Sequence, residues 1–103
     1  MMKLIMAIVN KDDSRKTMPA LTAEGFSVTR LATTGGFLMD ANVTLLIGVE
    51  EEKVDDVFAI LEKTCKKRTQ LVSNSFYGTS FPVEVTVGGA TVFVLPVERF
   101  EHL

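Results

Sequence analysis

Residues 43–65 decide the fold, and they read VTLLIGVEEEKVDDVFAILEKTC. Every second residue from Val43 to Val49 is aliphatic, which is the period of a β-strand with one buried face. Apolar residues then recur at helical spacing, with Cys65 one turn beyond the others: Val54, Val57, Phe58 and Leu61. The stretch therefore predicts a strand that leads into an amphipathic helix.

Charged residues of opposite sign flank this predicted helix. Three glutamates, residues 50–52, stand at its start. A basic cluster follows at its end: Lys63, Lys66, Lys67 and Arg68. Both groups are placed where they stabilise the helix dipole. We therefore prefer this explanation of the basic cluster to a phosphate-binding patch.

The residues before this stretch predict a strand, a helix and a second strand. Residues 3–9 form a continuous apolar run, as in a central strand covered on both faces. The side chains of residues 12–14 (Asp, Asp, Ser) are suited to cap a first helix that ends near Gly25. Pro19 lies inside that helix and lacks an N–H group, so we expect a late start or a bend. Residues 26–34 are predicted to form the second strand.

The residues after the second helix predict a loop and a hairpin. Residues 70–81 show no period and are rich in serine, asparagine and glycine, which predicts a loop with Phe76 and Tyr77 available to a partner. Residues 83–87 and 91–97 flank Gly88-Gly89, which predicts a β-hairpin. The order is β-α-β-β-α-β with an extra C-terminal strand. We expect an α+β fold, a ferredoxin-like sandwich forming one domain over residues 1–103.

Composition narrows the class of protein. The 103 residues are 47% hydrophobic and carry a formal charge of −2, so they predict an ordered globule with no bulk attraction to nucleic acid polymers or membranes. No apolar run has membrane-spanning length, and the N-terminal run is too short for a signal peptide, so we expect a cytoplasmic protein. One histidine and one cysteine cannot furnish a tetrahedral zinc site. The carboxylates stand at helix starts, and no nucleophile–base pair is visible, so an enzyme is not predicted.

The predicted sheet has more apolar surface than two short helices can cover. Its middle and final strands carry apolar residues on both faces: Leu31, Val43, Leu45, Leu46, Val92, Phe93 and Val94. Large exposed apolar faces normally mediate association. We therefore predict a homo-oligomer whose subunits pack sheet to sheet.

A glycine pair lies at the centre of residues 29–38, which read TRLATTGGFL and are followed by Asn42 and Thr44. Paired glycines let a ligand approach main-chain N–H groups closely. Phe37, directly after them, is suited to stacking on a base or on a neighbouring subunit. A tight turn with a core phenylalanine explains the same residues equally well.

Two stretches that contain Gly-Gly are long enough to be specific, LATTGGFL at residues 31–38 and VGGATVFVL at 87–95, and two shorter stretches accompany them, IGVE at 47–50 and PVEV at 82–85. Together they resemble the PII-like cyclic di-AMP receptor family (PstA-type signal-transduction proteins) over essentially the whole chain. The resemblance implies a cytoplasmic homotrimer that binds one cyclic di-AMP in each cleft between subunits. It implies no catalysis and no cofactor. Ordering of the loops at residues 35–42 and 70–81 would be the output to an unidentified downstream protein.

The resemblance also implies the residues of the site, with Thr29 on adenine and Phe37 as the stacking group: Thr29, Gly36, Phe37, Leu38, Asn42, Gly48 and Phe93. Structural roles are open for several of them. Thr29 is otherwise a strand residue and Gly48 a crossing point of the sheet, and for Phe93 a core role is at least as large. Phe100 is a further apolar candidate, or else a C-terminal anchor.

Three features depart from the family pattern. Ser27 stands where family members usually carry a basic residue, and His102 stands where they carry glutamine. The loop after the second helix is also shorter than usual. These departures favour the alternative that the chain is a PII-like trimer that has lost cyclic di-AMP binding and binds ATP, another nucleotide or a protein.

Overall fold

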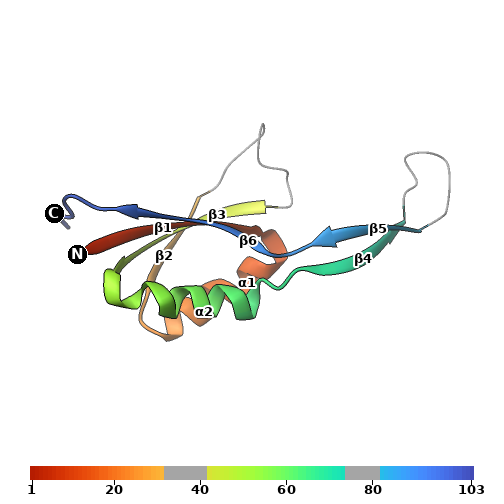
Figure 1. The fold of residues 1–103 in the computed structure, drawn as a ribbon, viewed down its shortest axis with the longest axis horizontal. Coiled ribbons are helices and arrows are strands. Elements are labelled where there is room, and N and C mark those ends of the chain that lie inside the picture. The colour runs from red at the N-terminus through yellow and green to blue at the C-terminus, as the bar shows by residue number, and fades with distance from the viewer. Residues whose placement is uncertain (32–41, 74–81) are drawn as a thin grey trace.

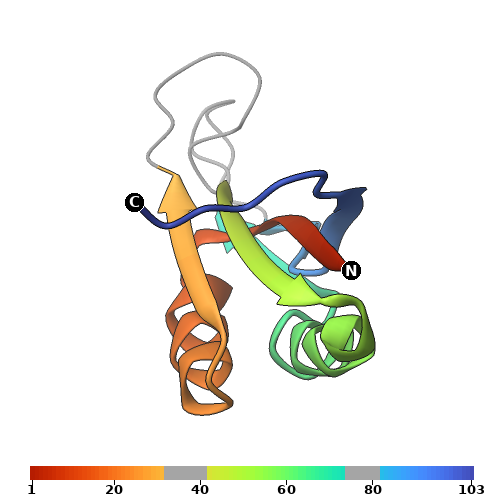
Figure 2. The same ribbon diagram turned by 90° about the vertical axis from the view of Figure 1, so that its left-hand side faces the viewer.

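The computed structural model describes residues 1–31, 42–73 and 82–103. Its elements follow in the order β1 (Met2–Asn10), α1 (Lys11–Ala23), β2 (Ser27–Leu31), β3 (Asn42–Glu50), a 3₁₀ helix (Glu51–Lys53), α2 (Val54–Thr64), β4 (Arg68–Ser73), β5 (Pro82–Val87) and β6 (Ala90–Pro96). Four strands form an antiparallel sheet in the order β2-β3-β1-β6. Both helices lie on one side of this sheet, and the β4–β5 pair extends away from it (Figures 1 and 2). The predicted ferredoxin-like α+β class is confirmed.

Helix α1 starts earlier than the sequence predicted. Its N-cap is Asn10, whose Oδ1 accepts hydrogen bonds from the backbone N–H groups of Asp12 (2.8 Å) and Asp13 (3.4 Å). The capping role assigned to residues 12–14 is therefore wrong, because the last residue of β1 already supplies a favourable cap. The helix also continues through Pro19, which is exposed, so the late start is wrong too.

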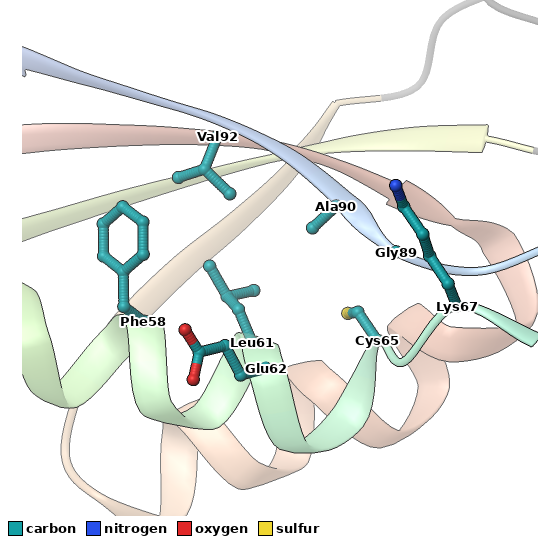
Figure 3. Close-up of a pocket in the computed structure, with 8 residues that line it drawn as sticks. All are labelled: Phe58, Leu61, Glu62, Cys65, Lys67, Gly89, Ala90 and Val92. Atoms are coloured by element: carbon teal, nitrogen blue, oxygen red, sulfur yellow. The ribbon is translucent and has the colours of Figure 1, made fainter.

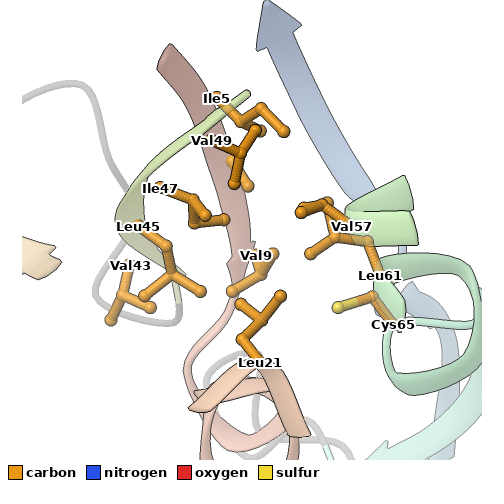
Figure 4. Packing of buried hydrophobic residues seen from close by; sticks show 11 residues of the cluster. Ile5, Val9, Leu21, Val43, Leu45, Ile47, Val49, Val57, Leu61 and Cys65 are labelled. Atoms are coloured by element: carbon orange, nitrogen blue, oxygen red, sulfur yellow. The ribbon is translucent and has the colours of Figure 1, made fainter. Parts of the chain in front are cut away.

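The core lies between the helices and the sheet, as the periodicity of residues 43–65 predicted. One face of β3 is buried at every second residue from Val43 to Val49. Helix α2 packs Val57 and Leu61 against it, with Cys65 just beyond the helix (Figure 4). β1 adds further buried side chains and α1 adds one more: Ile5, Ala7, Val9 and Leu21.

The C-terminal strands pair differently from the prediction. Residues 68–73 form β4, so the first part of the predicted loop is a strand. β5 pairs with β4 and not with β6, and β6 pairs with β1 as the fourth strand of the sheet. Gly88 and Gly89 do adopt positive φ angles of 84° and 77°, but they carry the chain from one sheet to the other. The predicted hairpin between residues 83–87 and 91–97 is therefore wrong.

The missed strand β4 and the wrongly predicted hairpin have one physical cause. Most of the β4 and β5 side chains whose burial the structure describes are exposed, with Leu71 64% exposed, so the apolar alternation by which a strand is recognised in a sequence is not required there. β6 instead gains by placing Val92 and Val94 opposite Ala7 and Ile5 on the helix side of the sheet. Within the described residues, no helix is long and apolar enough to cross a membrane.

Candidate functional site on the open face of the sheet

The face of the four-stranded sheet that points away from the helices is called the open face here. Directly opposed residues in antiparallel strands place their side chains on the same face. The registers therefore align one row of open-face residues across all four strands: Thr29, Leu46, Met6 and Phe93. A second row on the same face lies two residues away along each strand: Ser27, Gly48, Leu4 and Leu95.

A hollow of about 430 Å³ lies at the β2 side of these rows. We call it the Gly48 hollow, and its lining is mostly apolar: Met2, Leu4, Ser27, Thr29, Leu46, Gly48, Val97 and Phe100. Its volume falls in the usual range for small-molecule sites, roughly 300–1,000 Å³. The strands thus bring together Thr29 and Gly48, two of the residues proposed for the site from the sequence.

Gly48 forms part of the floor of the hollow because it has no side chain. A Cβ atom built on Gly48 would have only one neighbour within 4 Å, the Cε of Met2 at 3.7 Å. Its φ angle is not positive, so the backbone does not require glycine there. The glycine therefore leaves space above the strand without being needed for the fold.

Two hydroxyl groups stand at the edge of the hollow. Ser27 and Thr29 belong to β2, the edge strand of the sheet. They pair with Gly48 and Leu46 of β3, respectively. Both residues are exposed. Hydroxyl groups donate and accept hydrogen bonds, so this edge is suited to the polar atoms of a nucleobase or a ribose.

The C-terminal segment closes the hollow on another side. The N–H of Val97 donates to the carbonyl of Met2 at 3.2 Å, which holds the chain beside the start of β1. Beyond this point the segment passes across the strands toward β2 (Figure 2). It carries Phe100, which lines the hollow and is 66% exposed. Phe100 was only a secondary candidate from the sequence, since a terminal aromatic residue alone does not reveal where it packs.

Comparison with known proteins decides the family. A family model described as the cyclic-di-AMP receptor matches residues 2–103. This chain belongs to the cyclic-di-AMP receptor family. The resemblance drawn from the Gly-Gly motifs is confirmed.

Solved structures agree with this family fold. One is a functionally unknown protein from Pediococcus pentosaceus ATCC 25745, 40% identical over 99% of this chain and 97% of that chain, with a TM-score of 0.78. A DUF3240 family protein from Shewanella baltica OS155 is 13% identical over 99% of this chain and 96% of that chain, with a TM-score of 0.62. Arabidopsis thaliana PII bound to citrate is 21% identical over 93% of this chain and 74% of that chain, with a TM-score of 0.57. The last two show a shared fold.

In this family member, Phe93 lies on β6, at the edge of the open face opposite to the β2 edge that carries Thr29. It is 52% exposed, so the core role left open for it from the sequence is not found in the single chain. Two strands separate it from Thr29 in the same row, which corresponds to three inter-strand spacings, or about 14 Å. Phe93 does not line the Gly48 hollow.

Asn42 lies at the far end of β3 from Gly48. The two residues are on the same face but about 20 Å apart, at about 3.4 Å per residue. Asn42 instead lines a separate hollow of about 200 Å³ with Asn10, Lys67 and Gly89 among its neighbours. The remaining predicted contacts, Gly36, Phe37 and Leu38, lie outside the described residues, as do Phe76 and Tyr77.

A third hollow lies on the helix side, between α2 and β6 (Figure 3). Its volume is about 470 Å³, and Phe58, Leu61, Ala90 and Val92 form its apolar part. Cys65 is only 4% exposed at its edge. Of the predicted site residues that the structure describes, Thr29, Asn42, Gly48 and Phe93, none lines this hollow. Among the described residues, no group of three or more histidine, cysteine, aspartate or glutamate side chains is placed to hold a metal ion.

Proposed function

We propose that this protein is a non-catalytic receptor for cyclic di-AMP, with the Gly48 hollow as part of the binding site. The observation that carries the proposal is that Thr29, Gly48 and Ser27 meet at one exposed hollow in a member of the cyclic-di-AMP receptor family. The apolar lining and Phe100 are suited to adenine, and an aromatic residue that stacks on a base contributes about 1–3 kcal/mol. Membership of a receptor family supports binding, and we propose no catalytic step.

The site is completed, in this proposal, by a neighbouring subunit of a homotrimer. Thr29 and Phe93 stand at opposite edges of one face, so Phe93 of one subunit is suited to approach the Thr29 edge of the next. Apolar side chains exposed on this face also favour a partner that covers them: Leu31, Phe93 and Leu95. Contact between subunits and ordering of residues 35–42 and 70–81 on binding stay predictions.

Isothermal titration calorimetry tests the proposal directly. We expect saturable heat at about one cyclic di-AMP per subunit. The alternative is a trimer that binds ATP or another nucleotide, and Ser27 in the hollow favours it, since the basic residue usual in the family is missing at this position. If about 50 μM cyclic di-AMP gives no heat while ATP raises the melting temperature, the alternative stands.

Ser27→Arg is expected to tighten cyclic di-AMP binding by about tenfold to a hundredfold. Ser27 is exposed at the edge of the hollow, and an arginine there restores the charge usual in the family. A hydrogen bond to a charged group contributes about 1.5–3 kcal/mol. Calorimetry measures the change, and Thr22→Arg, at an exposed position of α1, controls for added charge. Equal gains in both variants would show that Ser27 does not face the ligand.

Phe93→Glu is expected to dissociate the assembly. Covering the open face with another subunit would bury this carboxylate without a partner, which costs several kcal/mol. Sedimentation velocity at about 10 μM protein should show a trimer for the natural chain and a monomer for the variant. Thr86→Glu, on the exposed β5 strand, should leave the trimer intact. A natural chain that sediments as a monomer would contradict the proposed cleft.

A further inference from the structure

A basic hollow lies on the helix side of the molecule, where the first half of α1 meets the end of α2. Its volume is about 450 Å³, and its lining is polar: Asp13, Lys16, Lys63, Thr64, Lys66 and Arg68. Both helices lie on one side of the sheet (Figure 2), so this hollow and the Gly48 hollow are on opposite sides of it. None of its residues belongs to the site proposed above.

Asp13 is the one carboxylate among the described residues that line this basic hollow, and it is already neutralised. Asp13 is 2% exposed, and its two carboxylate oxygens accept from Arg68: Nη2 lies 3.0 Å from Oδ1 and Nη1 lies 3.3 Å from Oδ2. Three lysines remain around the hollow. Over residues 1–31, 42–73 and 82–103, no carboxylate lies within 4.0 Å of Lys16, Lys63 or Lys66. The hollow therefore concentrates positive charge in a chain whose net charge is −2.

The helix dipole explains only part of this charge. Lys63 stands in the last turn of α2 and Lys66 follows it, where cations are favourable. Lys16 stands in the middle of α1, and Arg68 is the first residue of β4. Lys67, from the same basic run of the sequence, lines other hollows. The fold thus directs Lys67 away from the basic hollow and brings Lys16 of α1 into it.

We propose that this basic hollow binds a small polyanion with the chemistry of a linear polyphosphate. Ammonium groups bind phosphate as point charges, and three of them around one concave site match several phosphate groups at once. The volume of the hollow is in the range of small-molecule sites. Because Arg68 begins β4, the bound anion would also contact the base of the β4–β5 pair.

Titration of the full chain with tripolyphosphate at about 50 mM salt tests this inference. We expect saturable binding at one site, and a weakening of about tenfold or more in Lys16→Gln/Lys63→Gln, since each lysine contributes a charged hydrogen bond. Lys11→Gln/Lys53→Gln removes the same charge from the same side of the sheet but outside the hollow, and it should change the affinity less than about twofold. Amide NMR shifts should change at Lys16 and Thr64.

Cyclic di-AMP titrations separate this inference from the proposed function. Lys16→Gln/Lys63→Gln should leave cyclic di-AMP affinity unchanged, because the described residues that line the basic hollow and the Gly48 hollow are different. Equal weakening of tripolyphosphate binding in both double variants would overturn the inference, because general charge would then explain the binding. Absence of saturable binding, or NMR shifts confined to Thr29 and Gly48, would also overturn it.

Discussion

Gly48→Val is expected to abolish cyclic di-AMP binding while the protein stays folded. The two methyl groups of valine would occupy the floor of the Gly48 hollow, between Ser27 and Leu4. We expect affinity to fall by about a hundredfold or more, which corresponds to about 2.7 kcal/mol. Calorimetry with cyclic di-AMP measures this loss.

The fold should tolerate the same change. A Cβ at this position meets only Met2 Cε, at an ordinary contact distance of 3.7 Å. Glycine in a strand costs roughly 0.5–1 kcal/mol relative to alanine, so the melting temperature should be unchanged or slightly higher.

Two controls sharpen this experiment. Gly48→Ala adds a single methyl group and should weaken binding less than valine does. Thr86→Val makes a β-branched change at an exposed position of β5, away from the hollow, and should leave the affinity unchanged. Full affinity in Gly48→Val would mean that cyclic di-AMP binds elsewhere, and the proposed site would fail.

Gly88→Ala is expected to destabilise the protein by about 3 kcal/mol or more. Gly88 has a φ angle of 84°, which costs other residues roughly 1–2 kcal/mol. A Cβ there would also lie 2.4 Å from the carbonyl oxygen of Lys66 and 2.7 Å from Nη1 of Arg68. The first of these contacts is with backbone, so relief requires a shift of the chain between α2 and β4, and such strain adds about 1–3 kcal/mol.

Gly25→Ala provides the matched control. Gly25 has nearly the same φ angle, 86°, but a Cβ there would meet nothing within 4 Å. The control should therefore lose only about 1 kcal/mol from conformational strain. Urea unfolding at one fixed protein concentration measures both variants. Equal losses would show that the close approach of Gly88 to Lys66 does not exist in solution.

The sequence predicted those parts of the fold in which burial imposes a period. β3 and α2 bury one face each, so their apolar residues recur at intervals of two and of three to four. Loop and strand motifs were also sufficient to recognise the family, which the family model over residues 2–103 confirms. The candidate residues Thr29 and Gly48 came from that resemblance, and the structure brings them together.

Strand pairing could not be predicted in the same way. Strands pair through backbone hydrogen bonds, and every residue except proline offers the same backbone donor and acceptor. The sequence of β5 therefore does not indicate whether β4 or β6 is its partner. Gly88-Gly89 supplied the positive φ angles of a turn, but β6 pairs with β1, where Val92 is partly buried against the core. The sequence of β4 showed no period from which the strand could be predicted.

The sequence by itself determined the fold class, the family and the pair Thr29 and Gly48, because periodic burial and long motifs are local properties of the chain. Only the tertiary structure decided that Phe100 closes the Gly48 hollow, that Phe93 lies at the opposite edge of the open face, and that Lys16 joins Lys63 and Lys66. Each of those arrangements joins residues from separate elements. Their proximity follows from strand register and helix packing, which are set by the burial of the whole core.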